Sequence, residues 1–257
     1  MVKIGGATLG SHDTTIEDIV TLQQQGRLLV VVHGGGRLVT EWLSKRGIST
    51  RFVHGERVTD KATLEMVTAV LGGLANKEIV ADINSLGGRA IGISGVDGGL
   101  IQGRIEDIEL GYVGTVVKVD TAPLETLLQA GYIPVISPLS LHSFDKPKDA
   151  PPILNINADP VAGEIAAAIG AERLIFLTDV AGIRDRSGKL LTELSSGEAE
   201  ALVASGVASG GMVPKIKACL IALAGTSTTR IIDGRKLHAL LREVEGKGEG
   251  TTIYADK

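Results

Sequence analysis

The chain has little of several features that mark particular classes of protein. Cys219 is the single cysteine among 257 residues, which excludes an internal disulfide and leaves no thiolate ligand set for a metal. No apolar run reaches the roughly 18 residues of a membrane-spanning helix, and the N-terminus lacks the zones of a signal peptide. We therefore expect a cytoplasmic protein that makes no membrane contact.

The excess of one charge sign over the other is also small. The 26 basic and 30 acidic residues give a net charge of −4, whereas a nucleic-acid surface needs a clustered positive excess. We therefore expect no nucleic-acid partner. Cys219 stands among Ala218, Leu220 and Ile221, which favours a packed, inert thiol over a nucleophile.

Short apolar runs alternate with longer segments of helical period. Strands are expected at 2–4, 28–32, 90–93, 132–136, 173–177 and 230–232. Helices are expected at 15–25, 37–45, 60–85, 122–130, 159–169, 196–204, 212–224 and 236–245. This alternation of strands and helices predicts an α/β fold, a three-layer αβα sandwich around a mostly parallel open sheet. Glycine-broken, β-prone residues over 101–119 predict peripheral β-hairpins.

Two of the expected strands run directly into glycine turns. Val2-Lys3-Ile4 leads into Gly5-Gly6, and the strand over 28–32 leads into His33-Gly34-Gly35-Gly36. Because glycine has no Cβ, successive N–H groups can turn toward one anion. Ligands of a parallel sheet bind beyond the carboxyl ends of its strands, where both turns fall. The two turns, with Lys3 beside the first, predict a phosphate site.

Three familiar glycine motifs are absent. The Gly-Lys pairs at 188–189 and 246–247 lack the following Ser or Thr of a Walker A loop. The first turn lacks the later glycine of the dinucleotide fingerprint. The turn at 34–36 resembles an esterase oxyanion turn, but Gly92-Ile93-Ser94-Gly95-Val96 fails as a nucleophile elbow at its last position. Hydrolase chemistry is therefore the poorer interpretation.

Ordered motifs occur along the whole chain. They are Lys3-Ile4-Gly5-Gly6, His33-Gly34-Gly35-Gly36, Gly55-Glu56-Arg57-Val58-Thr59-Asp60, Asn76-Lys77, Gly92-Ile93-Ser94-Gly95, Tyr112-Val113-Gly114, Asn155-Ile156-Asn157-Ala158-Asp159, Thr178-Asp179-Val180-Ala181-Gly182-Ile183, Gly210-Gly211-Met212-Val213-Pro214-Lys215, Ile232-Asp233-Gly234-Arg235 and Gly250-Thr251-Thr252-Ile253. With them the chain resembles the amino acid kinase family, and within it the acetylglutamate kinases. The resemblance implies transfer of the ATP γ-phosphoryl to the side-chain carboxylate of N-acetyl-L-glutamate, in arginine biosynthesis. It also implies an N-terminal lobe, 1–170, for amino-acid binding and dimerisation and a C-terminal lobe, 171–257, for ATP binding.

The resemblance also implies catalytic roles. Lys3 and Lys215 would contact the transferring phosphoryl from two ends, and Asp159 would hold both lysines. The N–H groups of Gly5, Gly6 and Gly35 would line its path. Phosphoryl transfer suits such a site because it mainly requires two anions held in line while charge spreads over the moving group. Asp159 has a second explanation as the N-terminal acid of a helix.

Acceptor binding is implied for Arg57, Asn155 and the backbone of Gly35 and Gly36. The planar fork of arginine suits a carboxylate, and an asparagine amide can both donate and accept. His33 is better explained as a hydrogen-bonded turn histidine than as a base, because an ionised carboxylate has no proton to remove.

Nucleotide binding is implied for two segments and for Gly5. The segments comprise Thr178, Asp179, Val180, Ala181, Gly182, Ile183 and Arg184, and Val207, Ala208, Ser209, Gly210 and Met212. Mg²⁺ would be held mainly by phosphate and water oxygens, and no protein side chain is nominated as its ligand.

Assembly and substrate leave alternatives open. Arginine-inhibited relatives carry an extra helix before the first strand, whereas Lys3 follows Met1 almost at once, so we expect a homodimer that arginine does not inhibit. Residues 60–85 are the candidate dimer face, although packing on the sheet explains the same periodicity. A kinase of carrier-protein-linked aminoadipate or glutamate, in lysine biosynthesis, is disfavoured by Val58, where such relatives tend to have tyrosine. A non-catalytic amino-acid sensor would be expected to lose a lysine or Asp159, and carbamate and uridylate kinases are disfavoured by the Arg57 and Asn155 motifs.

Overall fold

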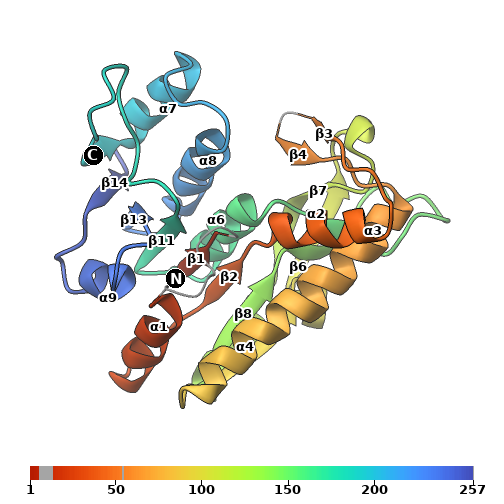
Figure 1. Ribbon diagram of the computed structural model, residues 1–257, viewed down its shortest axis with the longest axis horizontal. Coiled ribbons are helices and arrows are strands. Elements are labelled where there is room, and N and C mark those ends of the chain that lie inside the picture. The colour runs from red at the N-terminus through yellow and green to blue at the C-terminus, as the bar shows by residue number, and fades with distance from the viewer. Residues whose placement is uncertain (6–13, 54, 257) are drawn as a thin grey trace.

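An eight-stranded sheet forms the centre of the molecule (Figure 1). The computed structural model describes residues 1–5, 14–53 and 55–256. The strands of this sheet are β1 (Val2–Ile4), β2 (Val31–His33), β5 (Ala90–Ser94), β8 (Ile133–Ser137), β11 (Arg173–Thr178), β12 (Glu193–Ser195), β13 (Thr228–Asp233) and β14 (Gly250–Tyr254). Their order is β12-β14-β13-β11-β1-β2-β8-β5, and neighbours are parallel except β13 and β14. The expected mostly parallel sheet is confirmed.

Helices cover both faces of the sheet. They are α1 (Thr15–Gln24), α2 (Gly36–Lys45), α3 (Lys61–Val67), α4 (Asn76–Ser85), α5 (Ala122–Gln129), α6 (Ala158–Ala168), α7 (Ser196–Ala204), α8 (Met212–Ala222) and α9 (Ala239–Val244). Alternate residues of a strand point to opposite faces. Accordingly, Leu174 and Phe176 of β11 pack in one apolar cluster with α6 and α8, and Ile175 and Leu177 in another with α1 and α4. The expected αβα sandwich is confirmed.

A second, four-stranded sheet lies beside the first. It consists of β6 (Ile101–Ile105), β7 (Gly114–Val119), β9 (Leu139–His142) and β10 (Ile153–Asn155), in the order β10-β9-β6-β7. The antiparallel pair β6 and β7, with a register shift between Gln102 and Gly103, is the hairpin expected over 101–119. A short antiparallel pair, β3 (Phe52–Val53) and β4 (Glu56–Arg57), completes the strands of the described residues. Asn155 and Arg57 therefore both lie on peripheral strands.

The helix expected over 60–85 is one long rod, which Figure 1 shows in orange and yellow. Asp60 caps it by accepting a 2.7 Å hydrogen bond from the Thr63 N–H. Its middle part, η1 (Thr68–Ala75), is π-helical, a conformation that is rare and often found at functional sites. Of the apolar residues expected on a dimer face, Leu64, Val67, Val70, Leu71 and Ile79 are buried within this chain, whereas Leu74 and Val80 are half-buried. Intramolecular packing, the alternative explanation, accounts for the period of the buried residues.

Some expected boundaries are wrong for identifiable reasons. β2 begins at Val31 and not at residue 28, because Leu28 is 73% exposed and only the later residues enter the sheet. α9 begins at Ala239 and not at residue 236, because His238 has a left-handed backbone with φ of 52°. Among the helices in the described ranges, none has the length and apolar character needed to cross a bilayer.

Candidate active site

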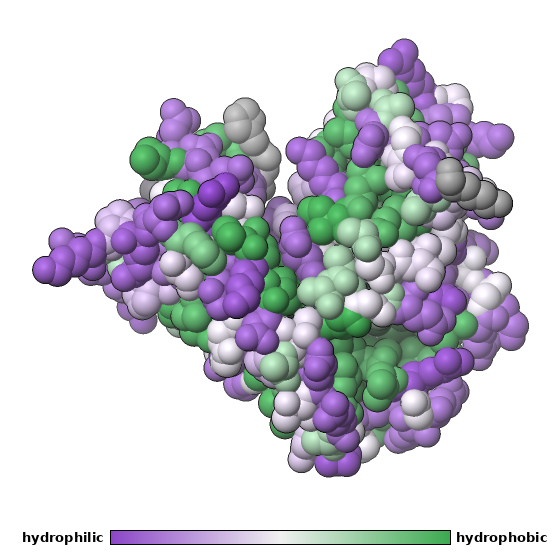
Figure 2. Space-filling model, turned by 180° about the vertical axis from the view of Figure 1, so that it is seen from behind, coloured by the Kyte–Doolittle hydropathy of each residue, from purple (hydrophilic) through white to green (hydrophobic). Residues whose placement is uncertain are grey.

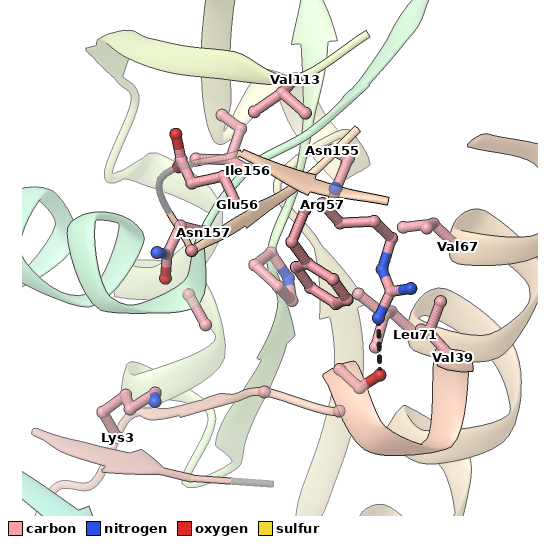
Figure 3. A pocket seen from close by; sticks show the side chains of 17 residues that line it. Lys3, Val39, Glu56, Arg57, Val67, Leu71, Val113, Asn155, Ile156 and Asn157 are labelled. Atoms are coloured by element: carbon pink, nitrogen blue, oxygen red, sulfur yellow. Dashed lines mark hydrogen bonds between the residues drawn. The ribbon is translucent and has the colours of Figure 1, made fainter. Parts of the chain in front are cut away.

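The carboxyl ends of β1, β2 and β11 meet at one edge of the sheet, because β1 pairs with β2 on one side and with β11 on the other. This is where ligands of open α/β sheets bind. A cavity of about 250 Å³ opens at this edge, and Lys3, the glycine turn 34–36, Arg57 and Asn155 line it (Figure 3). The fold thus gathers the candidate acceptor residues and one candidate catalytic lysine in one place.

Asp159 bridges two lysines beside this cavity. Its two carboxylate oxygens lie 2.6 Å from Lys3 Nζ and 2.9 Å from Lys215 Nζ. Lys3 comes from β1, Asp159 from the first turn of α6, and Lys215 from the first turn of α8. The two helices pack closely at Gly163, where an added Cβ would meet the Ala218 carbonyl oxygen at 2.5 Å. That close approach lets Lys215 reach Asp159.

The Lys3–Asp159–Lys215 cluster is mostly buried. The Lys3 and Asp159 side chains are 7% and 6% exposed, and that of Lys215 is 19% exposed. Burial lowers the pKa of Lys3 from its ordinary value, more than the Asp159 carboxylate raises it. Burial alone would raise the pKa of Asp159, but Lys3 and Lys215 hold it below its ordinary value. Two cations that share one carboxylate leave a surplus of positive charge, which suits an anionic ligand.

Arg57 lies across the cavity from Lys3 (Figure 3). Its Nη2 donates 2.8 Å hydrogen bonds to the Gly36 carbonyl and to Thr40 Oγ1. The guanidinium also lies 4.9 Å from the centre of the Phe52 ring. These contacts hold the arginine fork in place before any ligand arrives, which reduces the entropy that binding costs.

Asn155 is tied to Arg57 through Thr59. The Asn155 amide donates to Thr59 Oγ1 at 3.2 Å, and the buried Thr59 hydroxyl donates to the Arg57 carbonyl at 2.8 Å. Sequence patterns did not single out Thr59 or Thr40, because their contacts join distant segments. Thr59 could have been found from the sequence, because it lies in the Gly55–Asp60 motif.

The glycine turn at 34–36 has a backbone that few other residues could adopt. Gly35 has a φ of 150°, and an added Cβ would lie 2.6 Å from a methyl carbon of Leu71. Gly35 precedes the first residue of α2 and has no side chain to cap that helix. The N–H groups of a first helical turn, together with the helix dipole, favour an anion.

One of the three N–H donors expected along the phosphoryl path is engaged elsewhere. The Gly5 N–H donates to the Leu177 carbonyl at 3.1 Å, because it continues the hydrogen bonding of β1 with β11. Gly6 lies outside the described residues. Gly35, the third of these expected donors, lines the cavity.

The two expected nucleotide segments lie apart from the cavity walls. The first follows β11, where the Ile183 N–H donates to Thr251 Oγ1 at 2.8 Å and anchors the segment to β14. Asp179, Val180 and Arg184 are exposed there, whereas Thr178, Gly182 and Ile183 are buried and Ala181 is half-buried. In the second segment Ser209 and Gly210 are exposed, Ala208 is buried, and Val207 and Met212 are half-buried. This segment leads into α8, which carries Lys215.

The acidic and thiol side chains that the structure describes form no preformed metal site. Across residues 1–5, 14–53 and 55–256, no three His, Cys, Asp or Glu side chains gather in a way that could hold a metal ion. Asp185 accepts backbone hydrogen bonds from Ser187 and Lys189, as a turn acid does. Cys219 is buried, so the expected packed thiol is confirmed, and burial raises its pKa to about 12, which disfavours a thiolate nucleophile.

Comparison with known proteins places this chain in a family. Residues 1–233 match the sequence model of the amino acid kinase family. A protein named acetylglutamate kinase from Dehalococcoides mccartyi is 51% identical over 253 residues, which cover 98% of this chain and 93% of that protein. Another of that name, from Cereibacter sphaeroides, is 45% identical, with coverage of 98% and 86%.

A solved structure has a similar fold. N-acetylglutamate synthase from Neisseria gonorrhoeae, complexed with coenzyme A and N-acetyl-glutamate, superposes with a TM-score of 0.84 at 26% identity, over 100% of this chain and 59% of that one. The sequence match spans nearly the whole chain, and the structural match repeats its topology. The protein is therefore a member of the amino acid kinase family.

Proposed function

We propose that this protein transfers the γ-phosphoryl group of ATP to the side-chain carboxylate of N-acetyl-L-glutamate and forms N-acetylglutamyl 5-phosphate. The observation that carries the proposal is the Lys3–Asp159–Lys215 cluster at the edge of a cavity whose far side holds Arg57. The full-length likeness to proteins named acetylglutamate kinase supports the choice of acceptor.

The reaction needs little covalent help from the protein. An oxygen of the acceptor's side-chain carboxylate attacks the γ-phosphorus, an O–P bond forms, the bond to the β-phosphate oxygen breaks, and ADP leaves. No proton has to move, because the attacking carboxylate is already ionised. Catalysis then consists of holding two anions in line and stabilising the charge that spreads over the transferring group.

The two lysines would stabilise that charge from opposite sides. Lys3 lines the acceptor cavity, whereas Lys215 stands at the start of α8, directly after the expected nucleotide segment. Asp159 would keep both ammonium groups aimed at the phosphoryl and limit their mutual repulsion. The Gly35 N–H would add a donor on the acceptor side.

The acceptor would bind with its α-carboxylate toward Arg57 and its acetamido group toward Asn155. Arg57 is held by Gly36, Thr40 and Phe52, so its remaining donors are presented in a fixed geometry. A carboxylate at this end and a phosphoryl at the Lys3 end would place the side chain of the amino acid between them. The cavity of about 250 Å³ suits a small acceptor.

ATP would occupy the C-terminal side, along 178–184 and 207–212. We assign amino-acid binding to residues 1–170 and ATP binding to 171–257. Figure 1 shows the C-terminal elements α7 and α8 facing β3 and β4 across a gap, and the surface view in Figure 2 has a notch at its upper edge. Mg²⁺, when bound, would neutralise charge on the phosphates. Because the described residues offer no ligand cluster of their own, phosphate and water oxygens would hold it.

Cytoplasmic location and homodimeric assembly are further parts of the proposal. The net charge of −4 accords with a freely dissolved enzyme. Since Leu64, Val67, Val70, Leu71 and Ile79 of the long helix are buried in this chain, a dimer face would use the exposed side of the helix, with Lys61, Glu65 and Ala69. Sedimentation equilibrium of the wild type and of Glu65→Arg tests this, because a charge reversal in that face would dissociate the dimer.

The acceptor panel is the test of function. Purified protein is incubated with ATP, Mg²⁺, hydroxylamine and either N-acetyl-L-glutamate, L-glutamate, L-aspartate or no acceptor, and the trapped hydroxamate is measured. Hydroxamate is expected with N-acetyl-L-glutamate alone. If the protein binds ATP but yields no hydroxamate, the kinase proposal fails, and an amino-acid sensor or a kinase of a carrier-linked acceptor becomes the better explanation.

A further inference from the structure

His33 is a buried titratable side chain that the proposed chemistry leaves without a role. It is fully buried at the end of β2, and its Nδ1 lies 2.7 Å from the carbonyl oxygen of the next residue, Gly34. A carbonyl oxygen can only accept a hydrogen bond, so Nδ1 carries the proton. In the neutral ring, Nε2 is then an acceptor.

Asn76 supplies the donor for that acceptor. It is fully buried at the end of the π-helical segment, and its Nδ2 lies 3.2 Å from His33 Nε2. The same amide nitrogen lies 2.9 Å from the Val135 carbonyl oxygen and 3.3 Å from the Ile93 carbonyl oxygen. Because the amide has two hydrogens for three acceptors, one hydrogen is shared between two of them. Because both carbonyls only accept, they fix which way the Asn76 amide is turned.

The other end of the Asn76 amide is fixed as well. Its Oδ1 accepts a hydrogen bond from Lys77 Nζ at 3.0 Å. Gly92 on β5 makes room for this contact, because an added Cβ there would lie 1.9 Å from Asn76 Oδ1. These contacts form a hydrogen-bonded relay from Asn76 through His33 to the Gly34 carbonyl. The long helix and the three neighbouring strands β2, β8 and β5 supply its residues.

The relay ends on one peptide unit of the glycine turn. The Gly34 carbonyl and the Gly35 N–H belong to the same planar trans peptide, so they point in opposite directions. The Gly34 N–H is also held, because it donates to the Ile4 carbonyl at 3.0 Å. With the Gly34 carbonyl drawn toward His33, the Gly35 N–H is turned away from the imidazole.

We propose that Asn76 and His33 are positioning residues, which hold the Gly34–Gly35 peptide so that the Gly35 N–H points at the transferring phosphoryl. The inference rests on the proposed phosphoryl transfer. Burial lowers the pKa of His33 to about 4; the Gly34 hydrogen bond opposes this shift in part, and the charges of Lys3 and Lys77 contribute to it. The ring therefore stays neutral, and the relay keeps one direction, across the physiological pH range.

Two amide substitutions separate positioning from packing. In His33→Asn the amide nitrogen can stand where Nδ1 stands and still donate to Gly34. In His33→Gln the amide reaches the place of Nε2 and can still contact Asn76, but the Gly34 carbonyl loses its donor. We expect kcat of H33N to exceed that of H33Q by about tenfold or more, with KM for N-acetyl-L-glutamate similar in both. Equal kcat values in two variants of matched melting temperature would overturn the inference.

A spectroscopic measurement gives a readout that does not depend on activity. Imidazole ¹⁵N NMR of histidine-labelled wild type, assigned by comparison with H33N, should show His33 neutral and protonated at Nδ1 at pH 7. A ring protonated at Nε2, or at both nitrogens, would overturn the inference whatever the turnover. Absence of hydroxamate from wild type would instead refute the proposed function, so the two failures are distinguishable.

Discussion

Replacing Asp159 with asparagine removes the one negative charge between two lysines while keeping the shape of the side chain. Lys3, whose side chain is 7% exposed, would then be a buried cation without its partner. Removing one member of a buried ion pair costs about 3 to 5 kcal/mol. The Lys215 side chain is 19% exposed and can relax toward water, so we expect the lower end, about 3 kcal/mol of unfolding free energy.

A second substitution separates the stability of this cluster from its chemistry. In the double variant D159N with Lys3→Met, the stranded cation is gone, so most of the lost stability should return. Turnover should stay at least about 10²-fold below wild type, because the phosphoryl has lost a cation that stabilises its charge. The exposed Asp82→Asn is the matched control and should change neither quantity.

The assays are urea unfolding at several pH values and initial rates of hydroxamate formation. The folded-state pKa of Asp159 lies below its ordinary 3.8, so its contribution is present above about pH 4 and is lost as the pH falls through the folded-state value. The difference in unfolding free energy between wild type and D159N should therefore shrink in acid. If D159N is as stable as wild type at pH 7, or if the double variant is no more stable than D159N, the reasoning is refuted.

Three further substitutions probe other parts of the molecule. Lys215→Ala should lower kcat by about 10²-fold or more with little change in acceptor KM, while the exposed Lys217→Ala on the same helix should not; equal losses in both would contradict the assignment. Arg57→Ala should raise the acceptor KM by about 30- to 100-fold, the loss of a charge-assisted carboxylate contact, and an unchanged KM would speak against that role. Glu243→Gln should lower the unfolding free energy by about 3 kcal/mol without changing KM, because the buried Glu243 carboxylate lies 2.8 Å from Arg230; a melting temperature equal to wild type would contradict this.

Local signals in the sequence predicted most of the elements around the site. Apolar runs ending in glycine located β1 and the end of β2, and the helical period located the long helix, whose first turn Asp60 caps in the structure. In contrast, β14 has two threonines among its five residues and no apolar run. Its Thr251 is buried because the hydroxyl donates to the Leu191 carbonyl and accepts from the Ile183 N–H, partners that only the folded chain supplies.

Sequence patterns could not predict contacts between distant residues, for the same physical reason. The backbone pattern could mark Gly5 as a possible donor, but not that the Leu177 carbonyl takes its N–H. Nor could spacing show that Asn76 and His33, 43 residues apart, meet inside the protein. What the residues could predict was the chemistry of an anion site, since that depends on which side chains follow which strands.

The central claim is that the acceptor's own carboxylate oxygen attacks the γ-phosphorus. It is tested most directly with N-acetyl-L-glutamate carrying ¹⁸O in both side-chain carboxylate oxygens, with ATP, Mg²⁺ and hydroxylamine present. Hydroxylamine attacks the acyl carbon and releases phosphate together with the bridging oxygen. We predict that ³¹P NMR of the released phosphate shows one ¹⁸O atom in each molecule; phosphate without ¹⁸O would mean that water or another group had received the phosphoryl, and would contradict the account.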